Sequence, residues 1–148
     1  MVHLIPPRVI DVTTGPQGDQ AREDARIRAA LERHWADLTD QEAVHEIYHP
    51  DVVLEFPQGG ERLVGLANVR AMREAYPAAV SLEIGRIRGS GNLWVAENRI
   101  TYDGASPLHA VTIMEFQDGQ VVRETIYFGE PWEPPAWRAP WVEPMPAR

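Results

Sequence analysis

The chain has 148 residues, a length that suits one domain with a single buried core. Its formal net charge of -8 and pI near 5.1 repel phosphate backbones and anionic lipids, so we expect neither nucleic acid nor membrane as a partner. The sequence contains no cysteine, which excludes disulfides and thiolate chemistry. It shows no signal-peptide pattern and no apolar run of membrane-spanning length, so we expect a soluble, cytoplasmic protein.

The N-terminal part of the sequence divides into an arm and a long helix. Residues 1–18 are interrupted by proline and glycine and show no helical period, so we expect an N-terminal arm. Asp19 to Leu38 predicts a helix, because apolar residues recur at helical spacing along a stripe of Ile27, Leu31, His34/Trp35 and Leu38. His34 lies inside this stripe, where it either bonds water or backbone or donates a hydrogen bond to a ligand.

A second, short helix is predicted from Thr39, the N-cap of a capping box with Glu42, to His49. Its last five residues, His45 to His49, match H-E-x-x-H, the pattern in which two histidines bind zinc. The predicted helix is very short, however, and no later segment supplies a convincing third ligand. Both histidines would also lie on its exposed flank, beside a buried stripe of Val44, Ile47 and Tyr48. We therefore expect no bound metal.

The rest of the sequence predicts strands and one more helix. Asp51–Phe56 predicts a strand, a turn precedes Glu61–Val64, and Leu66–Tyr76 predicts a third helix. From Val80 onward the apolar period changes to two, which predicts antiparallel strands. One face of these strands carries Val80, Leu82 and Ile84 and, after a turn at 89–92, Trp94, Ala96, Asn98, Ile100 and Tyr102.

The stretch from Leu108 to Pro131 predicts a hairpin, because Asp118-Gly119 lies between two alternating apolar runs. Its inner face is formed by the even positions Leu108, Ala110, Thr112, Met114, Phe116, Val122, Glu124, Ile126 and Phe128. Glu124 is an ionisable residue on this largely apolar face. Burying a carboxylate costs free energy unless the group is paired, reaches solvent or takes part in binding or catalysis. Glu124 therefore indicates either a pocket or a different strand register.

Helices followed by a meander of strands predict an α+β domain in which the helices cover a curved sheet. A resemblance to the SnoaL-like family of the nuclear transport factor 2-like (NTF2-like) superfamily is carried by EIYHPDVVLEFPQGGERLVG (Glu46 to Gly65), RAMREAYP (Arg70 to Pro77) and IMEFQDGQVVRETIYFGEPWEPPAWRAPWVE (Ile113 to Glu143). It implies a cone-shaped fold, with three N-terminal helices packed on a curved, mostly antiparallel β-sheet around a pocket. The superfamily includes isomerases, cyclases, epoxide hydrolases, dehydratases and binding proteins, so the resemblance does not define a reaction.

Positions carried over from the superfamily narrow the chemistry. Ketosteroid isomerases place a general-base aspartate at the position of Phe56, a proton-donating acid at that of Thr112 and a tyrosine near His34. All three groups are replaced here, which argues against steroid isomerisation by that machinery. Glu97 to Arg99 faintly resembles the acid-arginine-acid set of the epoxide hydrolases, but both charged residues point to the other sheet face. Polyketide cyclases of the SnoaL-like family use an acidic residue near the pocket, and Glu124 is its nearest analogue.

These positions define a candidate small-molecule site. Its polar residues are Glu124, His34, Asn98 and Thr112, and its predicted walls are Trp35, Tyr48, Phe56, Tyr76, Trp94, Tyr102, Met114, Phe116 and Phe128. We hypothesise that Glu124 abstracts a proton next to a carbonyl while His34, Asn98 or Thr112 hydrogen-bonds the developing enolate. Alternatively, Glu124 is paired with Asn98 or an arginine and has no chemistry. We expect no cofactor, and two functions remain: a cyclase, isomerase or hydratase acting on a small hydrophobic carbonyl compound, or a non-catalytic binding protein.

The outer sheet face and the C-terminal tail predict contacts between subunits. The outer face mixes apolar and charged residues, namely Val95, Glu97, Arg99, His109, Val111, Ile113, Glu115, Val121, Arg123, Thr125 and Tyr127. Such a mixture suits a homodimer interface or a solvated face with ordinary ion pairs. After the domain, residues 19–130, the tail 131–148 holds three tryptophans among six prolines. We expect this tail to pack on the domain or on a partner subunit; a proline-rich ligand for another protein is the alternative.

Overall fold

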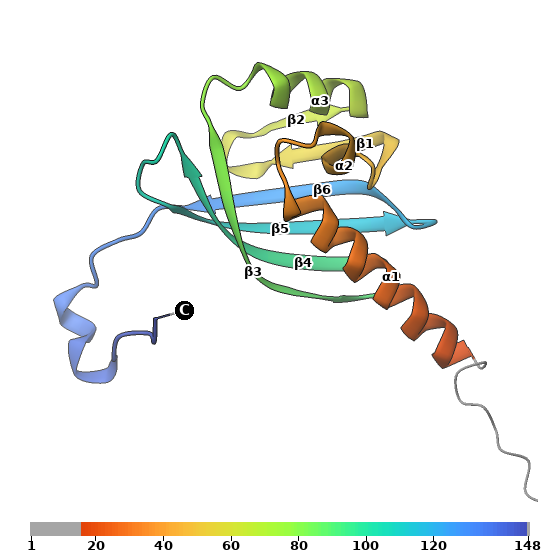
Figure 1. Cartoon of the computed structure of the whole chain (residues 1–148). Helices are drawn as coiled ribbons and strands as arrows, with labels where there is room; N and C mark the ends of the chain where they lie inside the picture. The colour runs from red at the N-terminus through yellow and green to blue at the C-terminus, as the bar shows by residue number, and fades with distance from the viewer. Residues whose placement is uncertain (1–15, 148) are drawn as a thin grey trace, which may run out of the picture.

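The computed structural model describes residues 16–147, so most of the predicted N-terminal arm lies outside the described part (Figure 1). The elements are α1 (Pro16–Ala36), α2 (Gln41–His45), β1 (Tyr48–Phe56), η1 (Pro57–Gly59), β2 (Glu61–Val64), α3 (Leu66–Ala75), β3 (Val80–Ser90), β4 (Leu93–Tyr102), β5 (Leu108–Gln117), β6 (Gln120–Gly129) and η2 (Ala136–Trp141). No helix in this part of the chain is long and apolar enough to cross a membrane.

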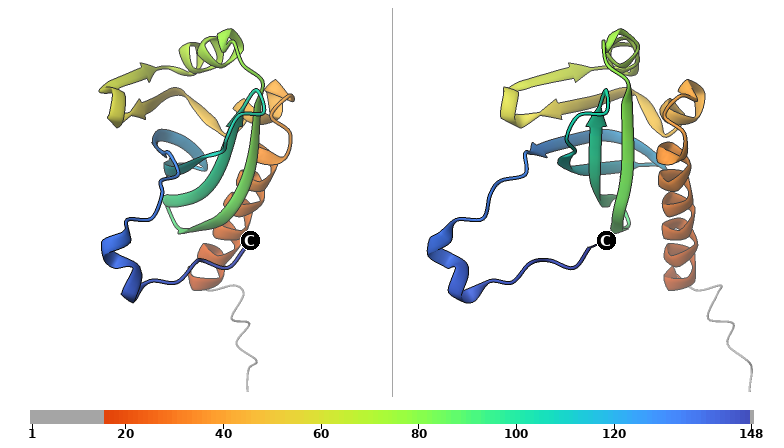
Figure 2. Two further views of the ribbon diagram at one scale, coloured as in Figure 1. Left: turned by 90° about the vertical axis from the view of Figure 1, so that its left-hand side faces the viewer. Right: turned by 60° about the vertical axis from the view of Figure 1, so that its left-hand side comes forward.

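The six strands form one sheet in the order β2-β1-β6-β5-β4-β3. β1 and β6 are parallel and every other neighbouring pair is antiparallel, so the predicted α+β fold with a mostly antiparallel sheet is confirmed. Figures 1 and 2 show the sheet curving around α1, while α3 lies over the end formed by β1 and β2. The stripe predicted on the first helix is buried against the concave face at Ile27, Leu31, His34 and Trp35.

The N-cap of α2 is Asp40 and not Thr39. The Asp40 carboxylate accepts a hydrogen bond from the backbone N–H of Ala43 at 3.1 Å. The side chain of Thr39 instead donates to Asp37 at 2.6 Å, so it is not available to cap the helix. The Asp37 carboxylate also accepts a hydrogen bond from the backbone N–H of Thr39, which forms a local turn just after α1 ends at Ala36.

The prediction that the second helix continues to His49 was wrong. The chain leaves α2 at His45, and β1 begins at Tyr48, opposite Val121 of β6. The N–H of Val121 also donates to the carbonyl of Ile47 at 2.9 Å, so pairing with β6 draws this segment into the sheet. Tertiary strand pairing here overrides a local helical pattern.

The H-E-x-x-H segment therefore spans two elements. His45 is buried at the end of α2, where its Nδ1 bonds the carbonyl of Gln41 at 2.7 Å, whereas His49 lies on β1. The expectation that both histidines share an exposed helix flank was wrong. Within residues 16–147, no group of three or more His, Asp or Glu side chains could hold a metal ion.

Both predicted hairpins form. In the β5–β6 turn, Asp118 and Gly119 have φ values of 52° and 79°, as a two-residue type I′ turn requires. In the β3–β4 hairpin, Val80 pairs with Tyr102 and Ile84 pairs with Asn98, which places the predicted alternating residues on one face. The concave face is thus continuous across four strands.

A β-bulge in β6 corrects one predicted position. The register shifts so that Phe116 pairs with Val121, while Met114 pairs with Glu124. Val121 is fully buried and Val122 is only half-buried, so the assignment of Val122 to the inner face and Val121 to the outer face was wrong. Beyond the bulge the predicted parity holds, and Glu124 is buried.

A close contact between β3 and β4 requires glycine at position 89. A Cβ there would lie 2.5 Å from the carbonyl oxygen of Leu93 and 2.6 Å from Cδ2 of the buried Trp94. We expect Gly89→Ala to lower the free energy of unfolding by about 1–3 kcal/mol, because the strand and the indole must shift. Gly129→Ala is the matched control, since a Cβ there meets no atom within 4 Å. Urea unfolding measures both variants, and equal stabilities would contradict the expected clash.

The C-terminal tail leaves the domain at the end of β6. Figures 1 and 2 show it as a separate loop that stands away from the sheet, with η2 as its regular structure. Trp132, Trp137 and Trp141 are 75%, 73% and 79% exposed. The tail therefore does not bury its indoles on the helices or pocket of its own chain.

Candidate functional site

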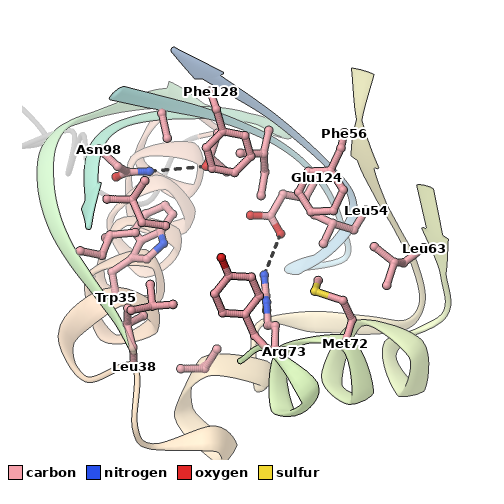
Figure 3. Close-up of a pocket in the computed structure, with 18 of the residues that line it drawn as sticks. Trp35, Leu38, Leu54, Phe56, Leu63, Met72, Arg73, Asn98, Glu124 and Phe128 are labelled. Atoms are coloured by element: carbon pink, nitrogen blue, oxygen red, sulfur yellow. Dashed lines mark hydrogen bonds and ion pairs between the residues drawn. The ribbon is translucent and has the colours of Figure 1, made fainter. Parts of the chain in front are cut away.

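A cavity of about 700 Å³ lies between the concave sheet face and the helices. Figure 3 shows Trp35 and Leu38 on one side of it, Met72 and Arg73 on another, and Phe56 and Phe128 above them. Its buried polar wall residues are Glu124, His34, Asn98 and Thr112, the four that the sequence places in the candidate site. A cavity of this size with mostly apolar walls suits a small organic molecule.

Glu124 is the centre of a buried polar network. Its side chain is 2% exposed, and its Oε2 accepts a hydrogen bond from the Tyr48 hydroxyl at 2.5 Å. Nη2 of Arg73 donates to the Tyr48 oxygen at 3.0 Å and lies 3.7 Å from Oε2 of Glu124. The network joins three elements, β1, α3 and β6, through one carboxylate oxygen.

The other carboxylate oxygen of Glu124, Oε1, receives no hydrogen bond from a residue in the described part of the chain. Figure 3 shows one oxygen directed toward Arg73 and the other toward the space between the lining side chains. Burial raises the pKa of Glu124 above its ordinary value, while Arg73 and the Tyr48 hydrogen bond oppose this rise. The carboxyl group of Glu124 thus has a raised pKa and is anchored through Oε2, while Oε1 is left for a ligand.

Arg73 brings a cation to the same wall. Its side chain is 24% exposed, and its guanidinium stacks on Tyr48 with Cζ 5.2 Å from the ring centroid. Burial lowers the pKa of Arg73, but its interactions with Tyr48 and Glu124 outweigh that effect and raise the pKa, so the guanidinium stays protonated. Its Nη1 is buried and has no hydrogen-bond partner among residues 16–147. This N–H group is therefore a donor in need of an acceptor.

His34 is held as a neutral imidazole. Its Nδ1 lies 2.7 Å from the carbonyl of Val44, so Nδ1 carries the proton and Nε2 is an acceptor. Burial, followed by the charge of Arg73, lowers the pKa of His34 to about 3. The ring also meets Tyr48 edge-on, with centroids 5.5 Å apart. His34 lines the cavity as predicted, but in this tautomer its free nitrogen accepts a hydrogen bond and cannot donate one to an enolate.

Asn98 on β4 and Thr112 on β5 are diagonal neighbours, because Asn98 pairs with Ala110 and Thr112 pairs with Ala96. Nδ2 of Asn98 lies 3.5 Å from Oγ1 of Thr112, which is a long contact between two buried groups. Oδ1 of Asn98 is buried and receives no hydrogen bond from the described residues. Arg73 Nη1 and Asn98 Oδ1 thus leave the cavity with an unused donor and an unused acceptor.

The predicted apolar walls divide into three groups. Five of them line the cavity: Trp35, Phe56, Tyr76, Tyr102 and Phe128. Tyr48 is not among the lining residues, but its hydroxyl donates a hydrogen bond to Glu124. Trp94, Met114 and Phe116 are not on the cavity wall but in the hydrophobic core. They share the parity of the inner face, but α1 covers their end of the sheet, where Arg28 stacks on Trp94 at 5.4 Å.

Sequence reasoning missed Arg73. The residue lies four positions after Val69 and three before Tyr76, so it falls on the apolar side predicted for the third helix. A charged residue at such a position was the available signal. The prediction that Glu97 and Arg99 point away from the inner sheet face agrees with the structure. Neither residue lines the cavity, and Glu97 pairs with Arg86.

The chain has an α+β fold with a cavity between helices and sheet, and comparison with known proteins identifies the family. Residues 27–124 match the model of the SnoaL-like domain, so the chain belongs to this family of the NTF2-like superfamily. No curated protein has a sequence that matches the chain significantly.

Solved structures give the same fold. An NTF2-like protein of unknown function from Burkholderia xenovorans LB400 is 43% identical, with a TM-score of 0.77 over 84% of this chain and 98% of that chain. A candidate ketosteroid isomerase from Kribbella flavida DSM 17836 is 30% identical, with a TM-score of 0.74 over 83% of this chain and 92% of that chain. A candidate polyketide cyclase from Sinorhizobium meliloti shares the fold at 20% identity and a TM-score of 0.58, covering 69% and 94% of the two chains.

Proposed function

We propose that the chain is a cofactor-independent enzyme that abstracts a proton next to the carbonyl of a small hydrophobic compound, with Glu124 as the general base. The observation that carries the proposal is the arrangement of this carboxyl group: buried, anchored through Oε2, and with Oε1 open to the cavity. Burial raises its pKa, which brings a carboxylate base closer to the pH at which it works.

Arg73 supplies the second half of this chemistry. Proton abstraction next to a carbonyl places negative charge on the carbonyl oxygen, and a fixed donor near that oxygen stabilises the enolate. Nη1 of Arg73 has no partner in the described structure and belongs to the same guanidinium that lies 3.7 Å from Glu124. A substrate carbonyl bound to Nη1 would bring its neighbouring C–H bond close to Oε1 of Glu124. The proton then moves to Oε1, and its return to another carbon would complete an isomerisation. In a cyclisation, the enolate carbon would attack a second carbonyl of the substrate, whose π bond breaks, and the resulting alkoxide would take the proton from Glu124.

The walls select the substrate class. The cavity of about 700 Å³ is lined mainly by aliphatic and aromatic side chains. Asn98 adds an acceptor on the side away from Arg73, and Nε2 of His34 adds a second acceptor. A ring compound with a carbonyl at one end and a hydroxyl at the other satisfies both sets of polar atoms. The name of the Kribbella flavida relative, ketosteroid isomerase, agrees with a ketone substrate. Phe56 replaces the isomerase base of the superfamily, so here the carboxylate comes from β6.

One observation favours a second function, binding without turnover. Tyr48 and Arg73 both engage Oε2 of Glu124, which is also the arrangement of a purely structural ion pair. In that case the same pocket would hold a hydrophobic molecule and leave it unchanged. Both functions require a ligand, and only the first requires proton exchange.

A thermal-shift screen tests the ligand class. Phenols, enolisable diketones and polycyclic ketones are tested against the wild type and Glu124→Ala across pH. A compound that binds only the native state, at a hundred times its dissociation constant, stabilises it by about 2.7 kcal/mol. We expect stabilisation by ketones or diketones and a smaller shift for Glu124→Ala. Failure of every compound to shift the wild type would contradict a small-molecule function.

The stabilising compound is then incubated with the wild type in D₂O. Deuterium at the carbon next to the carbonyl, detected by NMR or mass spectrometry, is the result that the enzyme function predicts. Unchanged ligand after long incubation would instead support the binding protein.

Arg73→Lys is expected to slow this exchange by at least tenfold, because lysine keeps the positive charge but loses Nη1 and the planar fork. The matched control is Arg70→Lys on the same helix, since Arg70 pairs with Glu42 and Glu74 at the surface. Exchange rates of both variants are measured with the same ligand. Equal rates for the two variants would remove Arg73 from the mechanism.

A further inference from the structure

The C-terminal strap, residues 131–147, exposes apolar surface that is unusual for a folded chain. Its three tryptophans are at least 73% exposed, and Met145 is 77% exposed. The other two tryptophans of the chain, Trp35 and Trp94, are 9% and 1% exposed. Several large exposed apolar side chains within one short segment point to an interaction site.

The strap is not held by its own domain. Among the described residues, the hydrogen bond formed within it joins Arg138 to Pro135, and no hydrogen bond or ion pair connects it to the sheet or helices. Its six prolines cannot donate to a sheet ladder, so the strap cannot bind as an added strand. They also restrict the free chain, which lowers the entropy lost when it docks.

The same chain carries an uncovered apolar strip on the outer sheet face. Val111 and Tyr127 are direct cross-strand partners on β5 and β6, and they are 37% and 44% exposed. Val95 and Ile113 form the next pair, between β4 and β5, and are half-buried. Leu93, at the start of β4, is 50% exposed. Within residues 16–147, the helices pack on the concave face and leave this strip open (Figure 2).

We propose that the strap docks on a second copy of this chain, with its tryptophans against the outer sheet face of that copy. Tyr127 lies two residues before the end of β6, so each strap starts beside the strip of its own chain. In a two-fold dimer this places each strap at the edge of the interface, where it reaches the strip of the other copy. Every chain then carries both the strap and the outer-face strip that binds it.

The size of the contact agrees with a stable dimer. Each indole buries roughly 150–250 Å², so six indoles from two straps bury on the order of 1,000 Å². The partner surface that they cover brings the total into the range of about 1,200–2,000 Å² for specific interfaces. Seventeen residues in an extended proline-rich conformation span about 50 Å, enough to cross a domain of this size.

Sedimentation of the full chain tests the dimer and the part that the strap plays in it. We expect the wild type to be dimeric at micromolar concentration, and Trp132→Ser/Trp137→Ser/Trp141→Ser to weaken the dimer at least a hundredfold. The control is Glu133→Gln/Glu143→Gln, which changes the strap without touching its indoles. Circular dichroism verifies that each variant is folded. A monomeric wild type, or a triple variant that dimerises as tightly as the wild type, would overturn the proposal.

Cross-linking shows whether the strap binds within a chain or between chains. The sequence has no cysteine, so Ala136→Cys in the strap and Val111→Cys on the outer face each introduce a unique thiol. The two variants are mixed and treated with a short bis-maleimide. A covalent link between position 136 of one chain and position 111 of the other supports the proposal. A double variant with both cysteines in one chain is treated in the same way. A link within that chain, together with no link between the mixed single variants, would overturn the proposal.

Discussion

Glu124→Gln is expected to lower the rate of proton exchange on a bound ketone by about 10²–10⁴-fold. Glutamine keeps the shape of the side chain and can still accept the hydrogen bond from Tyr48, but its amide cannot take up the proton. Binding of the ligand should therefore change much less than turnover. The rate of deuterium incorporation at saturating ligand measures the effect directly.

Glu115→Gln provides the matched control for this experiment. Glu115 lies on β5, is half-exposed on the outer face and pairs with Arg123 at 3.4 Å. Its substitution removes the same charge from the same sheet without reaching the cavity. Glu124→Gln retaining the exchange rate of Glu115→Gln would exclude Glu124 as the base, and the pocket would then be a binding site only.

Acidification is expected to destabilise the chain through His34. The pKa of this buried imidazole is lowered from 6.5 to about 3. Between pH 6.5 and pH 3, His34 is therefore protonated in the unfolded state and neutral in the folded state. The stability contributed by neutral His34 is therefore complete above pH 6.5 and is lost as the pH falls toward 3. Between pH 7 and pH 4 the loss amounts to about 3 kcal/mol.

His34→Asn isolates this contribution. Asparagine does not titrate, and its amide can donate to the carbonyl of Val44 in place of Nδ1. The free energy of unfolding, from urea titrations of both proteins at each pH, should fall more steeply with acid in the wild type. Glu124 acts in the opposite direction, because its raised pKa favours the folded state at low pH, but it is present in both proteins. Parallel pH profiles would contradict a buried, neutral His34.

The strands and the position of Glu124 were predictable because side-chain alternation is a local property of the chain. Glu124, Asn98 and Thr112 have the parity of the apolar face, and all three are buried on the cavity wall. The turn at Asp118-Gly119 was equally local, since positive φ at two successive residues has a strong sequence signature.

The remaining features depend on contacts that no local pattern contains. The start of β1 at Tyr48 follows from parallel pairing with β6, and the bulge before Glu124 follows from the register of β5 and β6. The Arg73 contact requires α3 to lie over β1, and it joins this helix to Glu124 on β6, which is far from it in sequence. His34 was placed correctly on its helix, but its tautomer depends on the carbonyl of Val44.

The pKa of Glu124 is the measurement that tests most directly whether the fold prepares a base. Glutamate carboxyl groups are labelled with ¹³C and titrated by NMR, and the Glu124 signal is assigned by its loss in Glu124→Gln. Burial and the charge of Arg73 act in opposite directions on this group, and we expect burial to dominate. The predicted result is a pKa above the ordinary value of 4.5. A pKa at or below 4.5 would mean that the ion pair with Arg73 dominates, and would contradict the assignment of Glu124 as a general base.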